Sequence, residues 1–379
     1  MTENNNIIQR KKHLLDLKML LKDSPAVGIL GPRQVGKSTL AKQIGCDHFF
    51  DLENPRDLAR LENPQVVLEG LSGIIAIDEI QRKPDLFPLL RFLIDQNRNQ
   101  SFLILGSASR ELISRSSETL AGRIQYLYLS GFNLGEVGSD QRDQLWLRGG
   151  FPRSYLADSD EASFRWRENF VADYLERDIP QLGISVPSSR LRRFWMMLSH
   201  YHGQTLNYAE LARSMDLSEK TIKHYIDILA STFMVQIVHP WHNNTKKRLI
   251  KSPKLYLKDS GIFHYLQSIQ SKEQLESHPK LGASWEGFAM FNWLEQQQIS
   301  PQNAYYWGVH GRGELDLYWH WGGKSYGAEF KYSDAPKRSA TIDFVMSELD
   351  LDHLWIIYPG VDRYQLDQKI TVLPLGQTI

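Results

Sequence analysis

The residues whose types and spacing most clearly support chemistry form the segment Gly-Pro-Arg-Gln-Val-Gly-Lys-Ser, from Gly31 to Ser38. This spacing is that of a P-loop, in which glycines let backbone N–H groups point at phosphate oxygens. Lys37 can reach the β- and γ-phosphates, the Ser38 hydroxyl can bind Mg²⁺, and the start of a following helix favours negative charge. The alternative is an ordinary glycine turn. We predict a nucleotide site formed by Gly31, Pro32, Arg33, Gln34, Val35, Gly36, Lys37, Ser38 and Thr39.

Two adjacent acids, Asp78 and Glu79, follow the apolar run 74–77. Such a run is typical of a buried parallel strand, and ligand sites of parallel sheets lie at the carboxyl ends of their strands. We expect Asp78 to hold the Mg²⁺ shell and Glu79 to orient or deprotonate the attacking water. The second acid favours hydrolysis over a kinase-type transfer of the phosphoryl group. The alternative is an acid pair at an exposed strand end.

Two further polar residues, Ser107 and Arg123, lie next to apolar runs and are candidates for sensing the γ-phosphate. Ser107 follows the run 101–105 and is placed to hold the attacking water. Arg123 precedes the run 124–129 and is placed to stabilise transition-state charge, in its own site or in that of a neighbouring copy. An arginine that is merely solvated is the alternative for Arg123.

The elements that must position these residues alternate between strand-like and helical patterns as far as residue 129. A parallel sheet with helices on both faces is the fold that such alternation predicts. In this fold the P-loop lies between the first strand and the helix after it, and the acid pair ends the third strand. The predicted strands are 26–30, 48–52, 73–77, 101–105 and 124–129.

Together these motifs resemble those of AAA-type P-loop ATPases. The segments that carry the resemblance are 31–38, 77–81, 106–109 and 120–123. The chain is most similar to the prokaryotic family that joins such an ATPase to a C-terminal domain of undetermined function. The resemblance extends over nearly the whole chain, through 149–152, 174–179 and 256–261. It implies ATP and Mg²⁺ as ligands, ATP hydrolysis as the activity, and a homo-oligomer as one candidate assembly.

The middle of the chain is expected to be helical and to contain a winged helix. Residues 141–203 show helical patterns and would form a lid over the nucleotide. The helices 207–215 and 219–230, joined by a three-residue turn, follow the helix-turn-helix plan, with Ser218 as N-cap of the second. The strands 233–238 and 254–257 would form the wing. Candidate nucleic-acid contacts are Lys220, Lys223, His224, Lys246, Lys247, Arg248, Lys251 and Lys254.

The acids Glu219 and Asp227 lie on the same helix as the first three of these basic residues. They leave a protein-binding module as an equal alternative to a DNA-binding one.

A second group of acids flanks Gly322 and Gly323, a dipeptide typical of a two-residue hairpin turn. With the turn centred there, Asp316 faces Glu329 and Glu314 faces Lys331. Alternation places these four side chains on one face of the hairpin and Leu315, Leu317, Ala328 and Phe330 on the other. Opposed carboxylates repel each other, and a divalent cation bound by hard oxygen ligands would offset that cost. We predict a second metal site formed by Asp316 and Glu329.

An aspartate on one strand and Glu-x-Lys on the next resembles the PD-(D/E)xK nuclease fold, which is the restriction-endonuclease-like fold. The resemblance implies that Asp316 and Glu329 bind Mg²⁺ and that Lys331 stabilises charge on the attacked phosphate or activates water. It also implies that Glu286, on a preceding helix, supplies another acid. The helix 339–349 and the strand 354–358 would complete the core. A solvated charged face, or a nuclease-like fold without cleavage, are the alternatives.

Length and composition limit the classes to which the protein can belong. Its 379 residues, 42% hydrophobic and 23% charged, predict a globular chain of two or three domains, which we place at 1–140, 141–260 and 261–379. Forty-four basic and 44 acidic residues disfavour nucleic-acid coating through bulk positive charge. The lone Cys46 excludes an internal disulfide and a cysteine zinc cluster. No apolar run approaches the ~18 residues of a membrane span, and the N-terminus lacks signal features, so we expect a cytoplasmic protein without a membrane partner.

The sequence therefore predicts an α/β chain: a P-loop sheet, a helical and winged-helix module, and a C-terminal α/β restriction-endonuclease-like domain. The predicted function is Mg²⁺-dependent ATP hydrolysis coupled to a nuclease-like domain that acts on DNA or RNA. The main alternative is an ATP-dependent regulatory switch whose C-terminal fold binds a protein or nucleic-acid partner without cleaving it. A P-loop kinase is a third possibility, disfavoured by Glu79.

Overall fold

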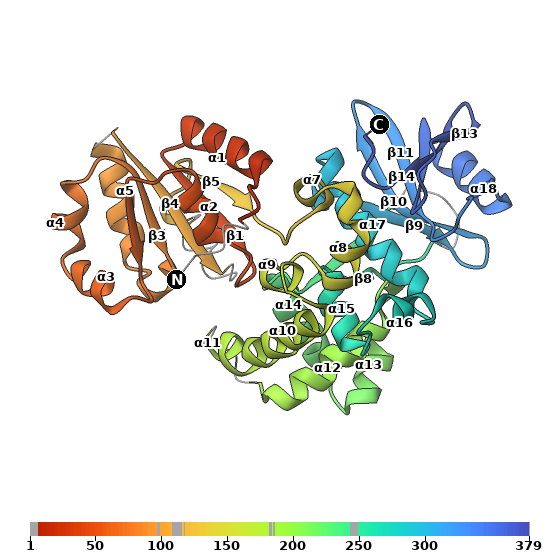
Figure 1. The fold of residues 1–379 in the computed structure, drawn as a ribbon, viewed down its shortest axis with the longest axis horizontal. Helices are drawn as coiled ribbons and strands as arrows, with labels where there is room; N and C mark the ends of the chain where they lie inside the picture. Colours follow the sequence, from red (N-terminus) through yellow and green to blue (C-terminus); the bar gives the residue numbers. More distant parts are fainter. Residues whose placement is uncertain are drawn as a thin grey trace. The chain divides into compact units, whose positions relative to one another are not determined.

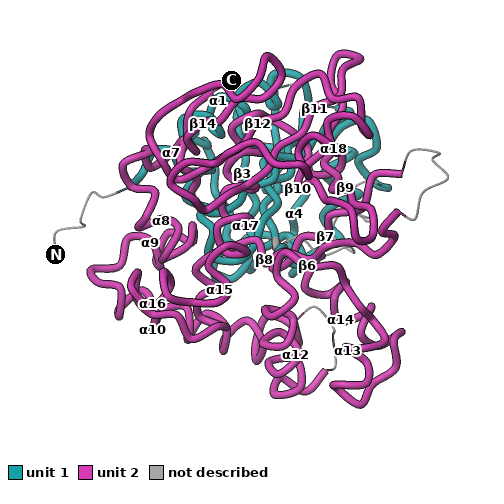
Figure 2. Tube along the Cα trace, turned by 90° about the vertical axis from the view of Figure 1, so that its right-hand side faces the viewer, with its two compact units in different colours: residues 1–131, 231–233 teal, residues 132–230, 234–379 magenta. Residues whose placement is uncertain are grey.

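A computed structural model describes residues 7–96, 99–107, 116, 118–181, 184, 186–242 and 249–378. The chain forms two compact units (Figure 2). The first comprises residues 1–131 and 231–233, and the second comprises residues 132–230 and 234–379. The P-loop and the Asp-Glu pair belong to the first unit, and the predicted winged helix and hairpin belong to the second. No helix in the described ranges is long and apolar enough to cross a membrane.

The first unit contains a five-stranded parallel sheet in the order β2-β3-β4-β1-β5 (Figure 1). All five predicted strands are present, with ends shifted by at most two residues. The carboxyl ends of the strands meet at one edge, so the P-loop after β1 and the acids after β3 lie at the same edge of the sheet. The strands are β1 (Ala26–Gly31), β2 (His48–Asp51), β3 (Gly73–Asp78), β4 (Gln100–Ser107) and β5 (Ile124–Tyr128).

Helices cover both faces of this sheet, as predicted. Successive residues of β1 point to opposite faces, so Ile29 joins one apolar core with Leu17 and Leu40, whereas Leu30 joins the other with Leu90. The first core contains α1 and α2, and the second contains α4 and α5. The helices of this unit are α1 (Lys11–Asp23), α2 (Lys37–Gln43), α3 (Pro55–Arg60), α4 (Pro64–Glu69), η1 (Ile80–Arg82) and α5 (Leu86–Gln96).

The first half of the second unit is helical where it is described. Its role as a lid over the nucleotide stays a prediction. Its helices are α7 (Leu134–Val137), η2 (Ser139–Gln141), α8 (Arg142–Arg148), α9 (Pro152–Tyr155), α10 (Asp160–Asp173), η3 (Tyr174–Asp178), α11 (Ile179–Gln181) and α12 (Ser188–His200).

A helix-turn-helix follows, formed by α13 (Tyr208–Met215) and α14 (Glu219–Ser231). Ser218 is the N-cap of α14 as predicted, because its Oγ accepts a hydrogen bond from the backbone N–H of Thr221 at 3.1 Å. The strand β8 (Lys254–Leu257) pairs antiparallel with both β6 (Gln204–Thr205) and β7 (Val235–Pro240). These elements enclose one apolar core, which includes Leu211, Ile222, Leu255 and Leu257.

We call β6, α13, α14, β7 and β8 the helix-turn-helix part. The strands of the C-terminal part form one sheet with its strands, because β9 pairs with β7. The nine-stranded order is β13-β14-β12-β11-β10-β9-β7-β8-β6. The strands are β9 (Tyr305–Val309), β10 (Gly313–Trp321), β11 (Lys324–Phe330), β12 (His353–Tyr358), β13 (Tyr364–Asp367) and β14 (Ile370–Pro374). The remaining helices are α15 (Ser260–Leu266), α16 (Lys272–Glu276), α17 (Leu281–Gln297), η4 (Pro301–Asn303) and α18 (Ala340–Leu349).

The predicted hairpin turn at Gly322 and Gly323 forms, and β10 pairs with β11 from Trp321 opposite Lys324 to Leu317 opposite Ala328. The predicted alternation along all of β10, however, is wrong. Between Leu315 and Tyr318 the strand advances three residues while β9 advances two, which is a β-bulge. Leu315 and Tyr318 consequently lie in the same apolar core, although regular alternation would place them on opposite faces.

The bulge also changes the partner of Glu314. Glu314 was expected to face Lys331, but in the structure it forms an ion pair with Lys254 of β8. Lys331 instead pairs with Glu329, two residues before it in the chain.

Candidate functional sites

The P-loop begins at the last residue of β1 and ends at the first residues of α2. Gln34 and Gly36 adopt positive φ angles of 62° and 98°, so the loop curls tightly, and Gly36 leaves open space where a side chain would be. Lys37 is buried, and its ammonium group donates to the carbonyl oxygens of Gly31 at 3.1 Å and Pro32 at 2.9 Å. The lysine therefore lies over the loop, held by neutral acceptors that phosphate oxygens could replace.

The hydroxyl and the acid predicted to share a Mg²⁺ shell are in contact. Ser38 Oγ donates a hydrogen bond to Asp78 Oδ2, joining the start of α2 to the end of β3. Asp78 is buried, and burial raises its pKa, whereas the hydrogen bond from Ser38 and the charge of Lys37 lower it. The carboxylate of Asp78 and the hydroxyl of Ser38 are hard oxygen donors of the kind that Mg²⁺ prefers.

Glu79 directly follows Asp78 in the chain and has a left-handed backbone conformation, with φ 54° and ψ 45°. Burial raises the pKa of its carboxyl, Lys37 opposes the shift, and Gln81 Nε2 donates a hydrogen bond to Glu79 Oε2. A non-glycine residue in this conformation costs energy and persists where the surrounding structure imposes it, often at functional sites. The neighbouring strand brings Ser107 opposite Gly31 in the β1–β4 register, beside the first P-loop residue.

Arg123 does not join this group within its own chain. It directly precedes β5, whose first residue lies opposite Ala26 at the start of β1, whereas the P-loop follows the end of β1. Arg123 and the first P-loop residue, Gly31, are separated by about 20 Å along the parallel strands. The Arg123 guanidinium pairs with Asp95 at 2.6 and 3.0 Å. A role in the site of a neighbouring copy stays a prediction.

Sequence reasoning missed two acids at the end of β2. Asp51 lies opposite Asp78 in the β2–β3 register, and its charge raises the pKa of Asp78 further. Glu53 pairs with the P-loop residue Arg33 at 2.7 Å. The signal was available, because Asp51 lies near the end of the predicted strand 48–52 and Glu53 directly follows it.

The second site gathers four carboxylates, which we call the carboxylate cluster: Glu286, Glu314, Asp316 and Glu329. Glu286 comes from α17, Glu314 and Asp316 from β10, and Glu329 from β11. The structure thus brings together the residues predicted for a nuclease-like site. Among the described residues, no group of three or more His, Cys, Asp or Glu side chains has the arrangement of a metal cluster.

Asp316 and Glu329 lie in contact, and both are buried. Asp316 Oδ2 accepts a hydrogen bond from the backbone N–H of Phe330 at 3.0 Å, and Lys331 Nζ lies 2.8 Å from Glu329 Oε2. Burial and the nearby charge of Asp316 raise the pKa of Glu329 well above its usual value. Burial would lower the pKa of Lys331, but Glu329 and Asp316 raise it, so the lysine is held as a cation.

Glu286 lies on α17, and its carboxyl is buried near Asp316. Burial and the charge of Asp316 raise the pKa of its carboxyl to about 7. The Tyr256 hydroxyl donates a hydrogen bond of 2.5 Å to Glu286 Oε1. Tyr256 comes from β8 in the helix-turn-helix part and was not predicted at this site.

The expectation that Lys254 contacts nucleic-acid phosphates is wrong. Only 2% of Lys254 is exposed, and its ammonium lies 3.3 Å from Glu286 Oε1 and 3.6 Å from Asp316 Oδ1, in addition to the pair with Glu314. Burial opposes its charge, but these partners raise its pKa well above the usual value. The available signal was the period of two in β8, which puts Lys254 and Tyr256 on one face.

The other basic residues predicted to contact phosphates differ in their placement. The exposed ones are Lys220, Lys223, His224 and Lys251, and Lys223 Nζ lies 5.1 Å from the centre of the Tyr208 ring. Lys246, Lys247 and Arg248 lie outside the described residues.

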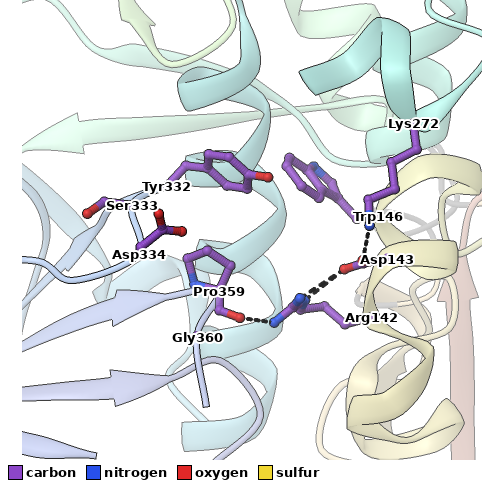
Figure 3. A pocket seen from close by; sticks show the side chains of 9 residues that line it. All are labelled: Arg142, Asp143, Trp146, Lys272, Tyr332, Ser333, Asp334, Pro359 and Gly360. Atoms are coloured by element: carbon purple, nitrogen blue, oxygen red, sulfur yellow. Dashed lines mark hydrogen bonds and ion pairs between the residues drawn. The ribbon is translucent and has the colours of Figure 1, made fainter. Parts of the chain in front are cut away.

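A pocket of about 270 Å³ begins at Tyr332, directly after Lys331 (Figure 3). Tyr332 and the residues after it form one wall, and side chains of α8 and α16 form the facing wall. Asp143 pairs with Arg142 at 3.0 Å and with Lys272 at 2.6 Å, so both cations of the pocket share one carboxylate. The sequence did not predict this pocket, because its walls come from four distant segments.

In comparisons with known proteins, three family models match successive parts of the chain. Residues 23–138 match the AAA domain family, residues 139–273 match a domain of unknown function (DUF8612), and residues 281–378 match another (DUF4143). The predicted resemblance to AAA-type P-loop proteins is confirmed by the match to the AAA domain family over residues 23–138, the part that contains the five-stranded parallel sheet.

The chain is 44% identical over 379 residues to the uncharacterized protein Rv2008c of Mycobacterium tuberculosis, covering 98% of this chain and 85% of that protein. Uncharacterized protein Mb2031c of Mycobacterium bovis matches with the same identity and coverage. The chain therefore belongs to the family of these proteins. Among solved structures, the Walker-type ATPase PABY2304 of Pyrococcus abyssi aligns with a TM-score of 0.49 and 16% identity, over 70% of this chain and 97% of that one.

Proposed function

We propose that the protein hydrolyses ATP at the P-loop and couples its nucleotide state to a nuclease-like C-terminal site that acts on nucleic acid. The contact between Ser38 and Asp78, beside a buried Lys37 that lies over the loop, is the observation that carries the first half of the proposal. It joins the P-loop to the acid of a different strand, as a phosphate and metal site requires.

The residues of the chain have the following roles in ATP hydrolysis. Lys37 exchanges the carbonyl oxygens of Gly31 and Pro32 for phosphate oxygens, which are charged and therefore stronger acceptors. Ser38 and Asp78 would hold Mg²⁺, which when bound neutralises phosphate charge. Glu79 orients the attacking water from its buried position near Lys37.

Phosphate release by the Lys37→Ala variant tests this assignment. Loss of the ammonium should lower release at least about 100-fold, because Lys37 is the group assigned to the β- and γ-phosphates. Lys42→Ala is the matched control: Lys42 lies on the same helix but is exposed and contacts the Phe49 ring. Release by Lys37→Ala at the wild-type rate would exclude ATP hydrolysis at this site. Transfer of labelled γ-phosphate to an acceptor other than water would instead favour a kinase.

Arg123 is proposed to act in the site of a neighbouring copy, because its own P-loop lies at the opposite edge of the sheet. Sedimentation of the Glu79→Gln variant with ATP tests this, since the variant should bind ATP without hydrolysing it. Formation of an oligomer is expected, and a particle that stays monomeric would exclude the arrangement.

At the C-terminal site, the chain order of one helix, three antiparallel strands, a helix and a parallel strand supports the PD-(D/E)xK resemblance. The carboxylates of Asp316 and Glu329 fit a divalent cation by their oxygen donors, their burial and their mutual contact. Mg²⁺, when bound there, would supply charge neutralisation at a phosphate. Lys331, which is half-exposed and pairs with Glu329, is proposed to stabilise the attacked phosphate.

Nucleic acid is the proposed substrate because two other features of the second unit suit it. The exposed face of α14 presents Lys220, Lys223 and His224 for phosphate contacts. The pocket next to Lys331 carries the partly exposed ring of Tyr332, a group on which bases stack, and two cations that share the carboxylate of Asp143. This second unit would work as a winged-helix module joined to a nuclease-like domain.

Cleavage assays decide between a nuclease and the regulatory switch that is the second candidate. Wild type and Lys331→Ala are incubated with single- and double-stranded DNA and RNA, with Mg²⁺ or Mn²⁺, with and without ATP. We expect cleavage by wild type alone. The switch is favoured by one observation, the presence of Lys254 among carboxylates that a metal would need, and absence of cleavage under all conditions would support it.

A further inference from the structure

Lys254 lies on β8, a strand of the helix-turn-helix part, but its side chain contacts the carboxylate cluster. On one side of β8, Leu255 and Leu257 are packed in the apolar core of α13 and α14. On the other side, Lys254 and Tyr256 contact Glu286. The strand thus connects the packing of one part of the second unit to the charges of another.

The ammonium of Lys254 meets three of the four carboxylates in the cluster. It lies 3.3 Å from Glu286 Oε1 and 3.6 Å from Asp316 Oδ1, and it forms an ion pair with Glu314. It donates a hydrogen bond to Glu286 and forms ion pairs with Glu314 and Asp316, so three carboxylates surround one buried ammonium. Lys331 forms an ion pair with the fourth carboxylate, Glu329.

The two oxygens of Asp316 have different partners. Oδ2 accepts the backbone N–H of Phe330, which fixes the orientation of the carboxylate, and Oδ1 faces Lys254. A divalent cation that used Oδ1 would meet the ammonium at short range. Two cations on one carboxylate repel strongly in a buried site, because little water screens them.

We propose that Lys254 is an internal cation that competes with a divalent cation for Asp316 and Glu286. Lys254 and Lys331 offset part of the charge of the four carboxylates without metal, and the site takes up metal only when the Lys254 ammonium is displaced. This inference rests on the proposed metal site at Asp316 and Glu329. Because Lys254 is carried on β8, a shift of that strand would change the metal affinity of the C-terminal site.

Mn²⁺ binding to the full chain, without nucleotide, tests the proposal by electron paramagnetic resonance of the free ion. All variants carry Asp78→Asn, which removes the Mg²⁺ ligand of the P-loop. Lys254→Met should bind Mn²⁺ at least about tenfold more tightly than the parent, since the competing charge is gone while the stem is kept. Lys254→Arg, which keeps a cation there, should bind as weakly as the parent. Equal or weaker binding by Lys254→Met would overturn the proposal.

A second measurement needs no change at Lys254 and covers the case in which Lys254→Met does not fold. Acetylation of wild-type lysines by a small reagent is followed by mass spectrometry with and without Mn²⁺. Lys254 should be protected without the ion and should react more when Mn²⁺ is present, because displacement exposes its ammonium. Protection that is unchanged at a Mn²⁺ concentration that saturates the site would overturn the proposal.

The variant Glu329→Gln separates this proposal from the metal site on which it rests. Mn²⁺ binding that is lost in Glu329→Gln but equal in the parent and Lys254→Met would keep the metal site and overturn only the competition. Mn²⁺ binding that is insensitive to Glu329→Gln in every background would overturn the metal site itself.

Discussion

The P-loop and the carboxylate cluster each contain a buried lysine, but different groups hold the two side chains. Lys37 donates to backbone carbonyls of its own loop, five and six residues away in the chain. Lys254 pairs with carboxylates of α17 and β10, and the nearest of them in sequence, Glu286, is 32 residues away. The first lysine is placed by local backbone geometry, and the second by tertiary packing and charge.

This difference has consequences for how each site can change. The two carbonyl acceptors of Lys37 are neutral, so a ligand that replaces them breaks no ion pair with them. Lys254 cannot move without exposing three carboxylates to one another in a site with little water. A ligand alone is therefore sufficient to recruit Lys37, whereas moving Lys254 requires another cation or a new conformation of β8.

The largest effect is expected from removing each lysine charge and measuring stability in EDTA. Lys254→Met should lower the free energy of unfolding by about 3–5 kcal/mol, because it leaves buried carboxylates without their cation. Lys37→Met should change it less, by about 1–2 kcal/mol, because it removes two hydrogen bonds to carbonyls and a charge that favours the ionised forms of Asp78 and Glu79. Denaturant unfolding followed by tryptophan fluorescence measures the first, since all ten tryptophans lie in the second unit.

The stability of the Lys37→Met variant is measured by calorimetry, because Lys37 lies in the first unit, which contains no tryptophan. Similar losses in the two variants would show that the contrast between the two lysines has no energetic basis. Lys331→Met is a further control, because its side chain is half-exposed and pairs with one carboxylate only.

The same contrast explains which parts of the molecule the sequence could predict. The five parallel strands, the P-loop and the hairpin turn follow from local patterns, because periodicity and turn chemistry involve residues close together in the chain. The β-bulge between Leu315 and Tyr318 has no local signature, and it changes the partner of Glu314. The sequence predicts Lys254 as a phosphate contact because the acids that it meets lie 32 or more residues further along the chain.

An intermediate effect is expected from acid, through a neutral histidine buried next to α17. His264 is hydrogen bonded to the Leu147 carbonyl at 3.0 Å and to Ser284 Oγ at 2.7 Å, and burial lowers its pKa to about 3. In the unfolded chain the pKa is about 6.5, so protons bind the unfolded state preferentially between these values. The His264 contribution to stability is therefore complete above pH 6.5 and falls by about 2 kcal/mol by pH 5.

Unfolding of wild type and His264→Gln at pH 7.5 and pH 5, followed by tryptophan fluorescence, measures this contribution. The difference between the two proteins should shrink by about 2 kcal/mol on acidification, because the glutamine does not titrate. A constant difference would mean that His264 is not held neutral, and that the helix carrying Glu286 is packed less tightly than its burial indicates.

The smallest effect concerns how packing positions Glu286, in contrast to the backbone geometry that positions Lys37. Gly287 follows Glu286 on α17, and a Cβ there would lie 2.4 Å from His202 Nε2, a buried atom. Gly287→Ala should cost about 1 kcal/mol net, because overpacking costs about 1–3 kcal/mol and the helical preference of alanine returns up to about 1. Gly282→Ala, on the same helix with open space around its Cβ, should be neutral or stabilising.

Unfolding free energies from tryptophan fluorescence compare the two glycine variants with wild type. A stabilised Gly287→Ala would show that His202 and α17 can separate, and that the glycine is not needed for space. Gly36→Ala tests the other kind of glycine, since at φ 98° the cost is backbone strain while nothing lies within 4 Å of the added carbon. Gly287 is thus required by a neighbour distant in sequence and Gly36 by its own backbone, which is the same division that separates Lys254 from Lys37.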